Sequence, residues 1–188
     1  MIHYSPQVYI IGLELNIKFN SSKTVVMNFS PTSVDNNRIS IKFGINTHLP
    51  VQKHKHLGLV LSNDLKWSSH IDYIVSDCCK LLGLLRRQSY NLSFEQKCTI
   101  YLSIIRPKIE YGSILYDSCV TSDAVKLEQL QRKAALTCTD TMYHTESKLM
   151  LIFLRWELLS ACRTVVDRSL FYKILQCNII LHHYICII

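Results

Sequence analysis

The chain has 188 residues, 48% of them hydrophobic, which is enough to bury a core and argues against an intrinsically disordered protein. This length allows one domain, or a small domain with an appendage. The 21 Lys and Arg against 14 Asp and Glu give a net charge of +7, a mild preference for polyanions, although charge alone fits a solvated basic surface better.

The cysteines and the apolar runs bear on the compartment. Eight cysteines occur without any Cys-x-x-Cys pair, a pattern typical of buried free thiols in a reducing environment. The first residues lack the basic segment of a secretory signal, and Glu14 interrupts their apolar run. The longest apolar runs are too short for a membrane span or contain His. We therefore expect an intracellular protein of the cytoplasm or nucleus, not secreted, with no membrane partner.

Strand patterns occupy the first third of the chain. The run 24–29 predicts a strand that follows a turn at 20–22, with Lys23 at the strand entrance. Residues 38–43 alternate apolar and polar side chains, which predicts a strand exposed on one face. Residues 57–61 supply a third strand. We expect these strands to pair into one small antiparallel sheet.

A basic cluster lies at the entry to the third predicted strand. Lys53, His54, Lys55 and His56 are consecutive there, a position suited to contact with a phosphate backbone. Two histidines also suggest a metal ion, but no carboxylate orients them, so we expect no metal site. Phosphate contact and plain solvation both remain open. A turn at 62–64 follows the strand.

The strongest predicted helix covers residues 67–87, where apolar side chains recur at helical spacing on one stripe. Arg86 and Arg87 near its end suit the negative end of the helix dipole and a nucleic-acid backbone about equally. A capping box at Ser93 to Gln96 begins a second amphipathic helix, which Pro107 stops or kinks.

A third amphipathic helix is predicted over residues 123–136. Its pattern places Leu127, Leu130 and Ala134 inward. Further helical segments follow beyond a polar loop.

Several of these segments resemble the reverse transcriptases of non-LTR retrotransposons. Residues 19–24, Phe-Asn-Ser-Ser-Lys-Thr, with the strand ending in Phe29-Ser30, are similar to motif D of that family. Residues 57–61, Leu-Gly-Leu-Val-Leu, followed by Leu-Lys-Trp-Ser-Ser-His-Ile at 65–71, are similar to its primer-grip hairpin and the start of its thumb. Two thumb elements also have counterparts: Pro-Lys-Ile-Glu-Tyr-Gly at 107–112 and Leu-Glu-Gln-Leu-Gln-Arg-Lys-Ala-Ala at 127–135. Arg155 stands where the family has the glycine of a Leu-Gly-Trp segment.

The resemblance implies roles for particular residues. Lys23 would lie near the phosphates of the incoming nucleotide as a candidate proton donor, insufficient for catalysis alone; without the resemblance it is a solvated turn residue. Weak, electrostatic binding of an RNA/DNA template-primer is implied for Lys53, Lys55, His56, Leu57, Gly58, Lys66, Arg86 and Arg87.

The catalytic carboxylates of the family have no counterpart in this sequence. Template-directed synthesis needs paired carboxylates that hold two metal ions. The sequence has eight aspartates, of which no two are adjacent, and it lacks the aromatic-x-Asp-Asp box. The resemblance thus covers about residues 16–176 and only the C-terminal part of the enzyme. We expect no cofactor in this chain, with Mg²⁺ required only by the intact family enzyme, and no polymerase activity from the chain alone.

The predicted fold class is α+β, with a small antiparallel sheet at the N-terminal side followed by a helical thumb-like bundle. Residues 1–15 are unassigned, 16–66 form a palm remnant with the primer-grip-like hairpin, 67–138 form the helical thumb, and 139–188 form a helical extension. The tail 177–188 contains two Cys and two His, but their spacing does not match a zinc knuckle. The alternative, supported by the apolar stripes alone, is a helical protein-interaction module without a nucleic-acid role.

Overall fold

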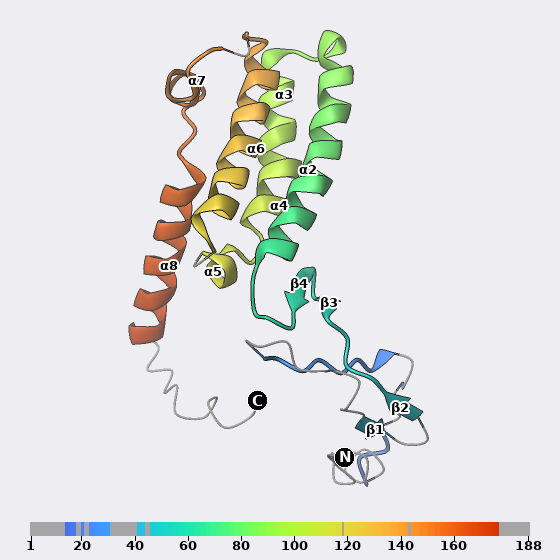
Figure 1. Ribbon diagram of the computed structural model, residues 1–188. Helices are drawn as coiled ribbons and strands as arrows, with labels where there is room; N and C mark the ends of the chain where they lie inside the picture. The colour runs from blue at the N-terminus through green and yellow to red at the C-terminus, as the bar shows by residue number, and fades with distance from the viewer. Residues whose placement is uncertain are drawn as a thin grey trace. The chain divides into compact units, whose positions relative to one another are not determined.

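Short strands near the N-terminus and helices over the rest of the chain make this an α+β protein, as the sequence predicts (Figure 1). The computed structural model describes residues 14–17, 20, 23–30, 41–43, 46–117, 119–142 and 144–176. The chain divides into two units, Met1–His70 and Ile71–Ile188, and each is described by itself.

Among the described residues of the first unit there are two separate two-stranded antiparallel sheets, rather than the single sheet that the sequence predicts. Strand β1 (Ile41–Phe43) pairs with β2 (Asn46–His48). Strand β3 (Lys53–His56) pairs with β4 (Leu59–Ser62), and His56 lies opposite Leu59. Both pairings join neighbours in the chain, for which the loss of loop entropy is smallest.

The predicted strand at residues 24–29 is wrong. That segment makes a single bridge from Val26 to Pro50, with the Val51 N–H donating to the Val26 carbonyl at 2.9 Å. Pro50 has no N–H to donate, and a proline at the pairing position ends a ladder. Of the strand predicted over 38–43, residues 38–40 lie outside the described residues.

The third predicted strand is displaced along the chain, because its first two residues form a turn. Leu57 and Gly58 connect β3 to β4 with φ angles of 47° and 85°. A two-residue hairpin loop with positive φ at both positions matches the twist of the flanking strands. The basic cluster therefore forms a strand itself. The predicted turn at 62–64 is present, with the Leu65 N–H donating to the Ser62 carbonyl at 3.0 Å.

Helix α2 spans Ser68–Arg87 and confirms the predicted helix. Its apolar stripe is buried as expected, through the side chains of Ile71, Ile74, Cys78, Leu82 and Leu85. A 3₁₀ turn (η3, Ser89–Asn91) follows α2. No described helix is both long enough and apolar enough to cross a bilayer.

Helix α3 (Phe94–Ile100) begins with the predicted capping box. The Ser93 Oγ accepts from the Gln96 N–H at 3.3 Å, and the Ser93 N–H donates to the Gln96 Oε1 at 2.9 Å. A π-helical segment (η4, Tyr101–Ile105) then leads into α4 (Arg106–Glu110). Pro107 accounts for the irregularity, because its ring would clash with the carbonyl four residues earlier in a regular α-helix.

The remaining helices are α5 (Ser113–Tyr116), α6 (Thr121–Thr139), α7 (Ser147–Leu154) and α8 (Leu159–Gln176). Helix α6 buries Leu127, Leu130 and Ala134 as predicted. It contacts α3, α7 and α8, so it is the central helix of the second unit. Beside it the rings of Tyr101 and Trp156 stack with their centroids 4.2 Å apart, and both side chains are buried.

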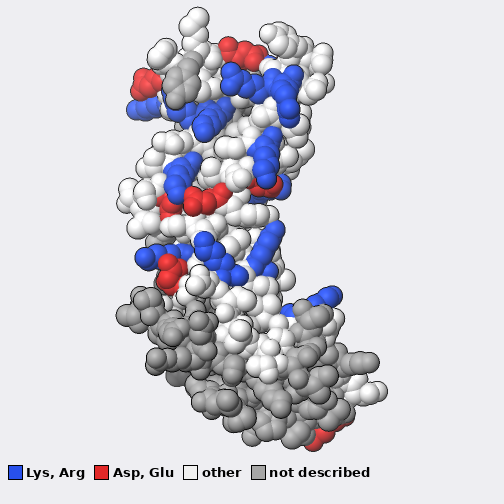
Figure 2. Space-filling model, turned by 45° about the vertical axis from the view of Figure 1, so that its right-hand side comes forward, with Lys and Arg blue, Asp and Glu red and all other residues white. Residues whose placement is uncertain are grey.

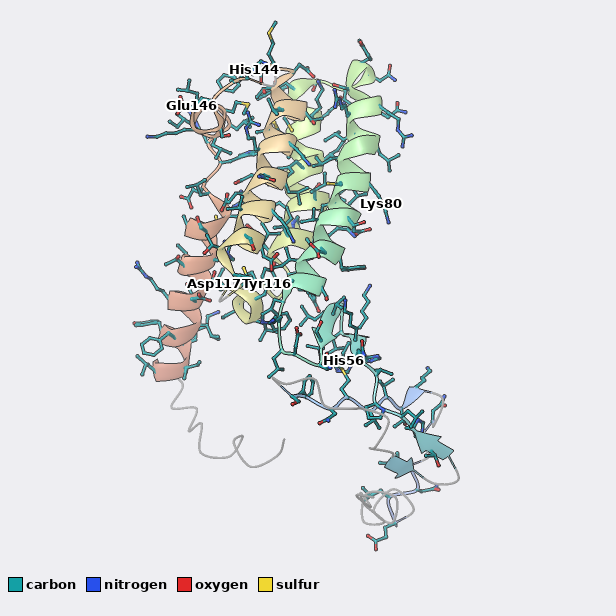
Figure 3. All side chains as sticks on the ribbon, viewed as in Figure 1. His56, Lys80, Tyr116, Asp117, His144 and Glu146 are labelled. Carbon is teal, nitrogen blue, oxygen red and sulfur yellow. The ribbon has the colours of Figure 1, made fainter. Side chains whose placement is uncertain are left out.

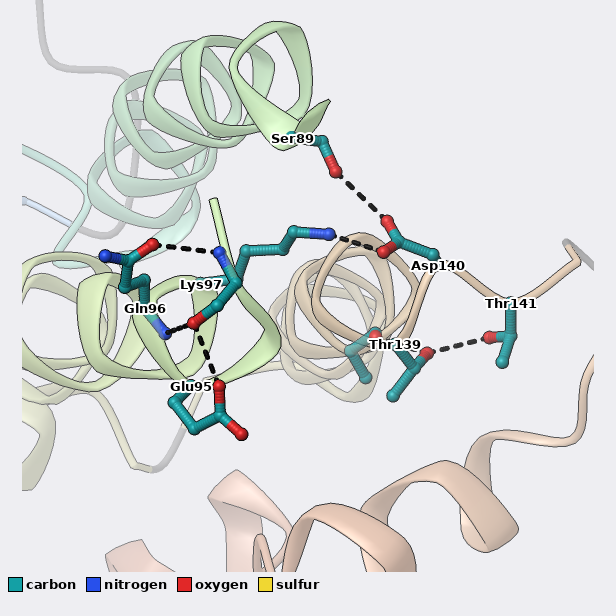
Figure 4. Close-up of polar contacts among 9 residues, drawn as sticks. Ser89, Glu95, Gln96, Lys97, Thr139, Asp140 and Thr141 are labelled. Carbon is teal, nitrogen blue, oxygen red and sulfur yellow. Dashed lines mark hydrogen bonds and ion pairs between the residues drawn. The ribbon is translucent and has the colours of Figure 1, made fainter. Parts of the chain in front are cut away.

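A buried cation joins α3 to the end of α6 (Figure 4). Lys97 is only 2% exposed, and its Nζ forms an ion pair with the Asp140 carboxylate. The Ser89 hydroxyl donates to the other oxygen of that carboxylate at 3.0 Å. The bond from Lys97 lowers the pKa of Asp140, and the bond from Ser89 adds to the effect. One carboxylate thus connects η3, α3 and α6.

Candidate nucleic-acid interface

The β3–β4 hairpin presents most of the residues predicted to bind nucleic acid. Lys53, Lys55 and His56 are exposed on β3, and Leu57 in the turn is 75% exposed. Because side chains alternate along a strand, the two lysines share one face and the two histidines the other. The His54 and His56 rings, 6.2 Å apart between centroids, agree with this alternation. Figure 3 labels His56 on this hairpin.

His70 fixes the second strand of the hairpin, a role that the sequence reading missed. The Val60 N–H in β4 donates to the His70 Nδ1 at 3.3 Å, and the Trp67 ring meets the imidazole edge-on at 5.9 Å. Burial, and secondarily the charge of Lys55, lower the pKa of His70. The imidazole is therefore neutral at pH 7 and able to accept this bond. The Trp-x-x-His spacing places the two rings near each other, but nothing in the sequence indicates the bond from Val60.

Lys66 and Lys23 lie elsewhere in the first unit. The Lys66 side chain is highly exposed, and its Nζ is 4.0 Å from the Asp64 carboxylate, which offsets part of its charge. Lys23 is exposed, and its N–H donates to the Asn20 carbonyl at 3.1 Å, as the predicted turn requires. The segment 23–30 reaches the end of the hairpin, where the Ser30 N–H donates to the Asn63 carbonyl at 3.0 Å.

Arg86 and Arg87 form a second group, in the other unit. Both are exposed in the last turn of α2, and neither forms an ion pair within the described part of the chain. Lys80, labelled on α2 in Figure 3, precedes Arg87 by seven residues and so lies on the same face of the helix. The sequence reading did not include Lys80 among the binding residues, although this spacing was visible.

Many other cations of the helical unit are paired with acids. The pairs are Lys97–Asp140, Arg106–Glu110, Lys108–Asp77, Lys126–Asp72, Lys126–Asp123 and Arg163–Asp117. Figure 2 shows the result on one face, where basic side chains are spread over the helices with acidic ones among them. These acids offset part of the basic charge of the helices, which lowers their attraction for a phosphate backbone.

The described residues do not fit a two-metal site. In the part of the chain that the structure describes, no three His, Cys, Asp or Glu side chains lie close enough together to hold a metal ion. The Cys and His residues of the tail 177–188 lie outside that part. No catalytic step through Mg²⁺ is assigned to this chain.

Comparison with protein-family models, with curated proteins and with solved structures gives no match to this chain. The relation to reverse transcriptases therefore stays a prediction from the motifs quoted above.

Proposed function

We propose that this chain is the C-terminal part of a non-LTR retrotransposon reverse transcriptase and binds an RNA/DNA template-primer weakly through phosphate contacts. The support is that the three matching segments 57–71, 107–112 and 127–135 occur in the family's order, and that a hairpin, a long helix and further helices follow one another there. Under this proposal the protein works inside the cell, in the cytoplasm or nucleus.

The observation that carries the proposal is the exposed basic strand β3. Lys53 and Lys55 project on one face of a hairpin whose turn has the tight geometry of Leu57 and Gly58. A rigid hairpin holds its cations without a large entropy loss on binding, which suits a grip on a sugar-phosphate backbone. The bond from Val60 to His70 adds to this rigidity.

The chain alone is proposed to bind and not to polymerise. Lys23 is able to donate a proton to a leaving pyrophosphate, but proton donation without paired carboxylates leaves the metal-dependent part of the reaction unsupported. Lys23 is therefore assigned a supporting role that requires residues this chain does not contain.

The test is fluorescence anisotropy of a labelled RNA/DNA primer-template, measured over a range of salt concentrations. We expect binding at low salt that falls steeply as salt rises. Lys53→Glu with Lys55→Glu, and separately Arg86→Glu with Arg87→Glu, should each weaken binding and reduce the salt slope by up to about 2.

The matched control is Lys133→Glu with Lys148→Glu, two exposed lysines on α6 and α7. This pair changes the net charge by the same amount, so it should weaken binding much less if position matters. No binding at low salt, or equal loss in all three double variants, would contradict the proposal.

The second candidate is the helical protein-interaction module, and two observations favour it. A groove of about 350 Å³ between α2 and the α3–η4 segment is lined almost wholly by apolar side chains. Several large apolar side chains on α7 and α8 are exposed, among them Phe153 and Phe171. Exposed apolar surface of this kind marks protein interfaces. If neither the wild-type chain nor any of the three double variants binds the primer-template, this candidate is favoured.

A further inference from the structure

Helix α8 packs on the helical unit with one face only. That face carries Leu159, which is 1% exposed, and Arg163, whose Nε donates to the Asp117 Oδ1 at 3.0 Å. The neighbours of α8 across this face are α5 and α6. A hydrogen bond also joins the start of α8 to α6, in which the Ser160 N–H donates to the Glu128 Oε1 at 2.9 Å.

The opposite face of α8 carries a second stripe of mainly apolar side chains, interrupted by one arginine, which we call the α8 seam. Its members are Leu158, which directly precedes the helix, and Ala161, Val165, Arg168, Tyr172 and Leu175 within it, all of them exposed. Val165, Tyr172 and Leu175 are 58%, 60% and 62% exposed. The members are separated by three, four, three, four and three residues, the a/d spacing by which one helix pairs with another. A helix that is largely apolar on two opposite faces is suited to packing on both of them.

We propose that the α8 seam pairs with the α8 seam of a second copy of this chain, with the two helices antiparallel. A two-fold axis between Val165 and Arg168 brings Leu158 opposite the partner's Leu175 and Ala161 opposite the partner's Tyr172. Thus the smallest side chain of the seam meets the largest. Val165 meets the aliphatic stem of the partner's Arg168, whose guanidinium reaches solvent.

The antiparallel arrangement follows from size and charge together. A parallel pair would place Arg168 against the partner's Arg168 and Ala161 against the partner's Ala161, leaving a charge repulsion beside a gap. Like charges at facing positions disfavour a pairing, and a polar residue in such a seam fixes orientation. Only the antiparallel register makes the seam complementary to itself.

The expected affinity is low. The seam runs for about 26 Å along the helix, so the interface is small and we expect a weak dimer. Each copy carries a net charge of +7, so screening the repulsion between copies should strengthen pairing at high salt. Nucleic-acid binding has the opposite salt dependence, so the two proposals fail or succeed independently.

The test is sedimentation equilibrium of the full chain from about 1 to about 300 μM, with two variants of one residue. Val165→Glu should keep or strengthen the dimer, because each glutamate faces the partner's Arg168. Val165→Arg should weaken it at least tenfold, because it places two like charges together twice per dimer. Val165 is exposed in the monomer, so circular dichroism should show the same helix content in both variants.

Two results would overturn the proposal. A wild-type chain that stays monomeric over the whole range would mean that something other than a second copy covers the seam, such as the tail 177–188. Equal loss of dimer in the glutamate and arginine variants would show that residue 165 does not face the partner's Arg168, which contradicts the antiparallel arrangement. A dimer that survives with glutamate and is lost with arginine supports it.

Discussion

The buried Lys97–Asp140 pair allows a quantitative prediction for the helical unit. Replacing Asp140 by Asn removes the negative charge but keeps the shape, and it leaves the Lys97 ammonium buried beside a weaker acceptor. Asn is also suited to the left-handed backbone of this residue, with φ of 51° and ψ of 26°. The variant therefore isolates the charge from the backbone geometry.

The magnitude follows from the burial of the two partners. Removing one partner of a fully buried ion pair costs about 3 to 5 kcal/mol, because the other charge is left uncompensated. Lys97 is buried, but the Asp140 side chain is 64% exposed, so water screens part of the interaction. We expect Asp140→Asn to lower the free energy of unfolding by about 2 kcal/mol. Lys97→Met removes the buried charge itself and should cost less than about 1 kcal/mol.

Urea unfolding followed by far-UV circular dichroism measures both variants, because the helices lie almost wholly in this unit. The pH dependence provides an internal check. The pKa of Asp140 is lowered from its ordinary value of 3.8, so the stability from the pair is present above that value and is lost as the pH falls through the lower folded pKa. The difference between the wild type and Asp140→Asn should shrink over that interval. The reasoning would be refuted if Lys97→Met lowered the free energy of unfolding strongly while Asp140→Asn left it unchanged. Packing of the lysine stem would then matter more than its charge.

Two further predictions concern single residues. Arg155 ends α7 in the left-handed region, with φ of 56° and ψ of 36°, and its side chain is exposed. Arg155→Gly should therefore raise the free energy of unfolding by about 0.5 to 1 kcal/mol, measured in thermal or urea melts. Arg155→Ala should give no gain, because alanine does not favour this backbone conformation. The pKa of His70 is lowered from 6.5, chiefly by burial, so the stability that its neutral ring gives to the hairpin is present above pH 6.5 and is lost as the pH falls through the lower folded value. Trp67 fluorescence should report this titration, and His70→Asn, which keeps an acceptor at the Nδ1 position, should flatten it; an unchanged curve in that variant would contradict the assignment.

The helices were predictable because a repeat of 3.6 residues leaves a clear pattern over long segments. The stripe of α2, the capping box of Ser93 and the interior of α6 follow from spacing alone. The predicted strand began at the wrong residue, because Leu57 is a poor turn former and its apolar side chain fits a strand pattern. Its positive φ is imposed by the pairing of β3 with β4, which no local preference reveals.

The candidate site was predictable in part. Exposure of Lys53, Lys55 and His56 follows from a basic strand at the surface, and the structure agrees. The bond from Val60 to His70 joins residues ten positions apart, and the pairing of Lys97 with Asp140 spans 43 positions. Contacts of that kind depend on tertiary packing, so a single sequence does not indicate them.

The π-helical segment η4 affects which positions of the sequence must carry side chains suited to burial. A π turn holds one residue more than an α turn, so it accommodates the extra residue by widening. Tyr101 and Ile105, at the two ends of the segment, and Ile109 after it are all buried. They recur at every fourth residue, and in a regular α-helix such positions would drift by about 40° at each step. The wider turn reduces this drift, so a sequence that fits this fold needs side chains suited to burial at every fourth position here.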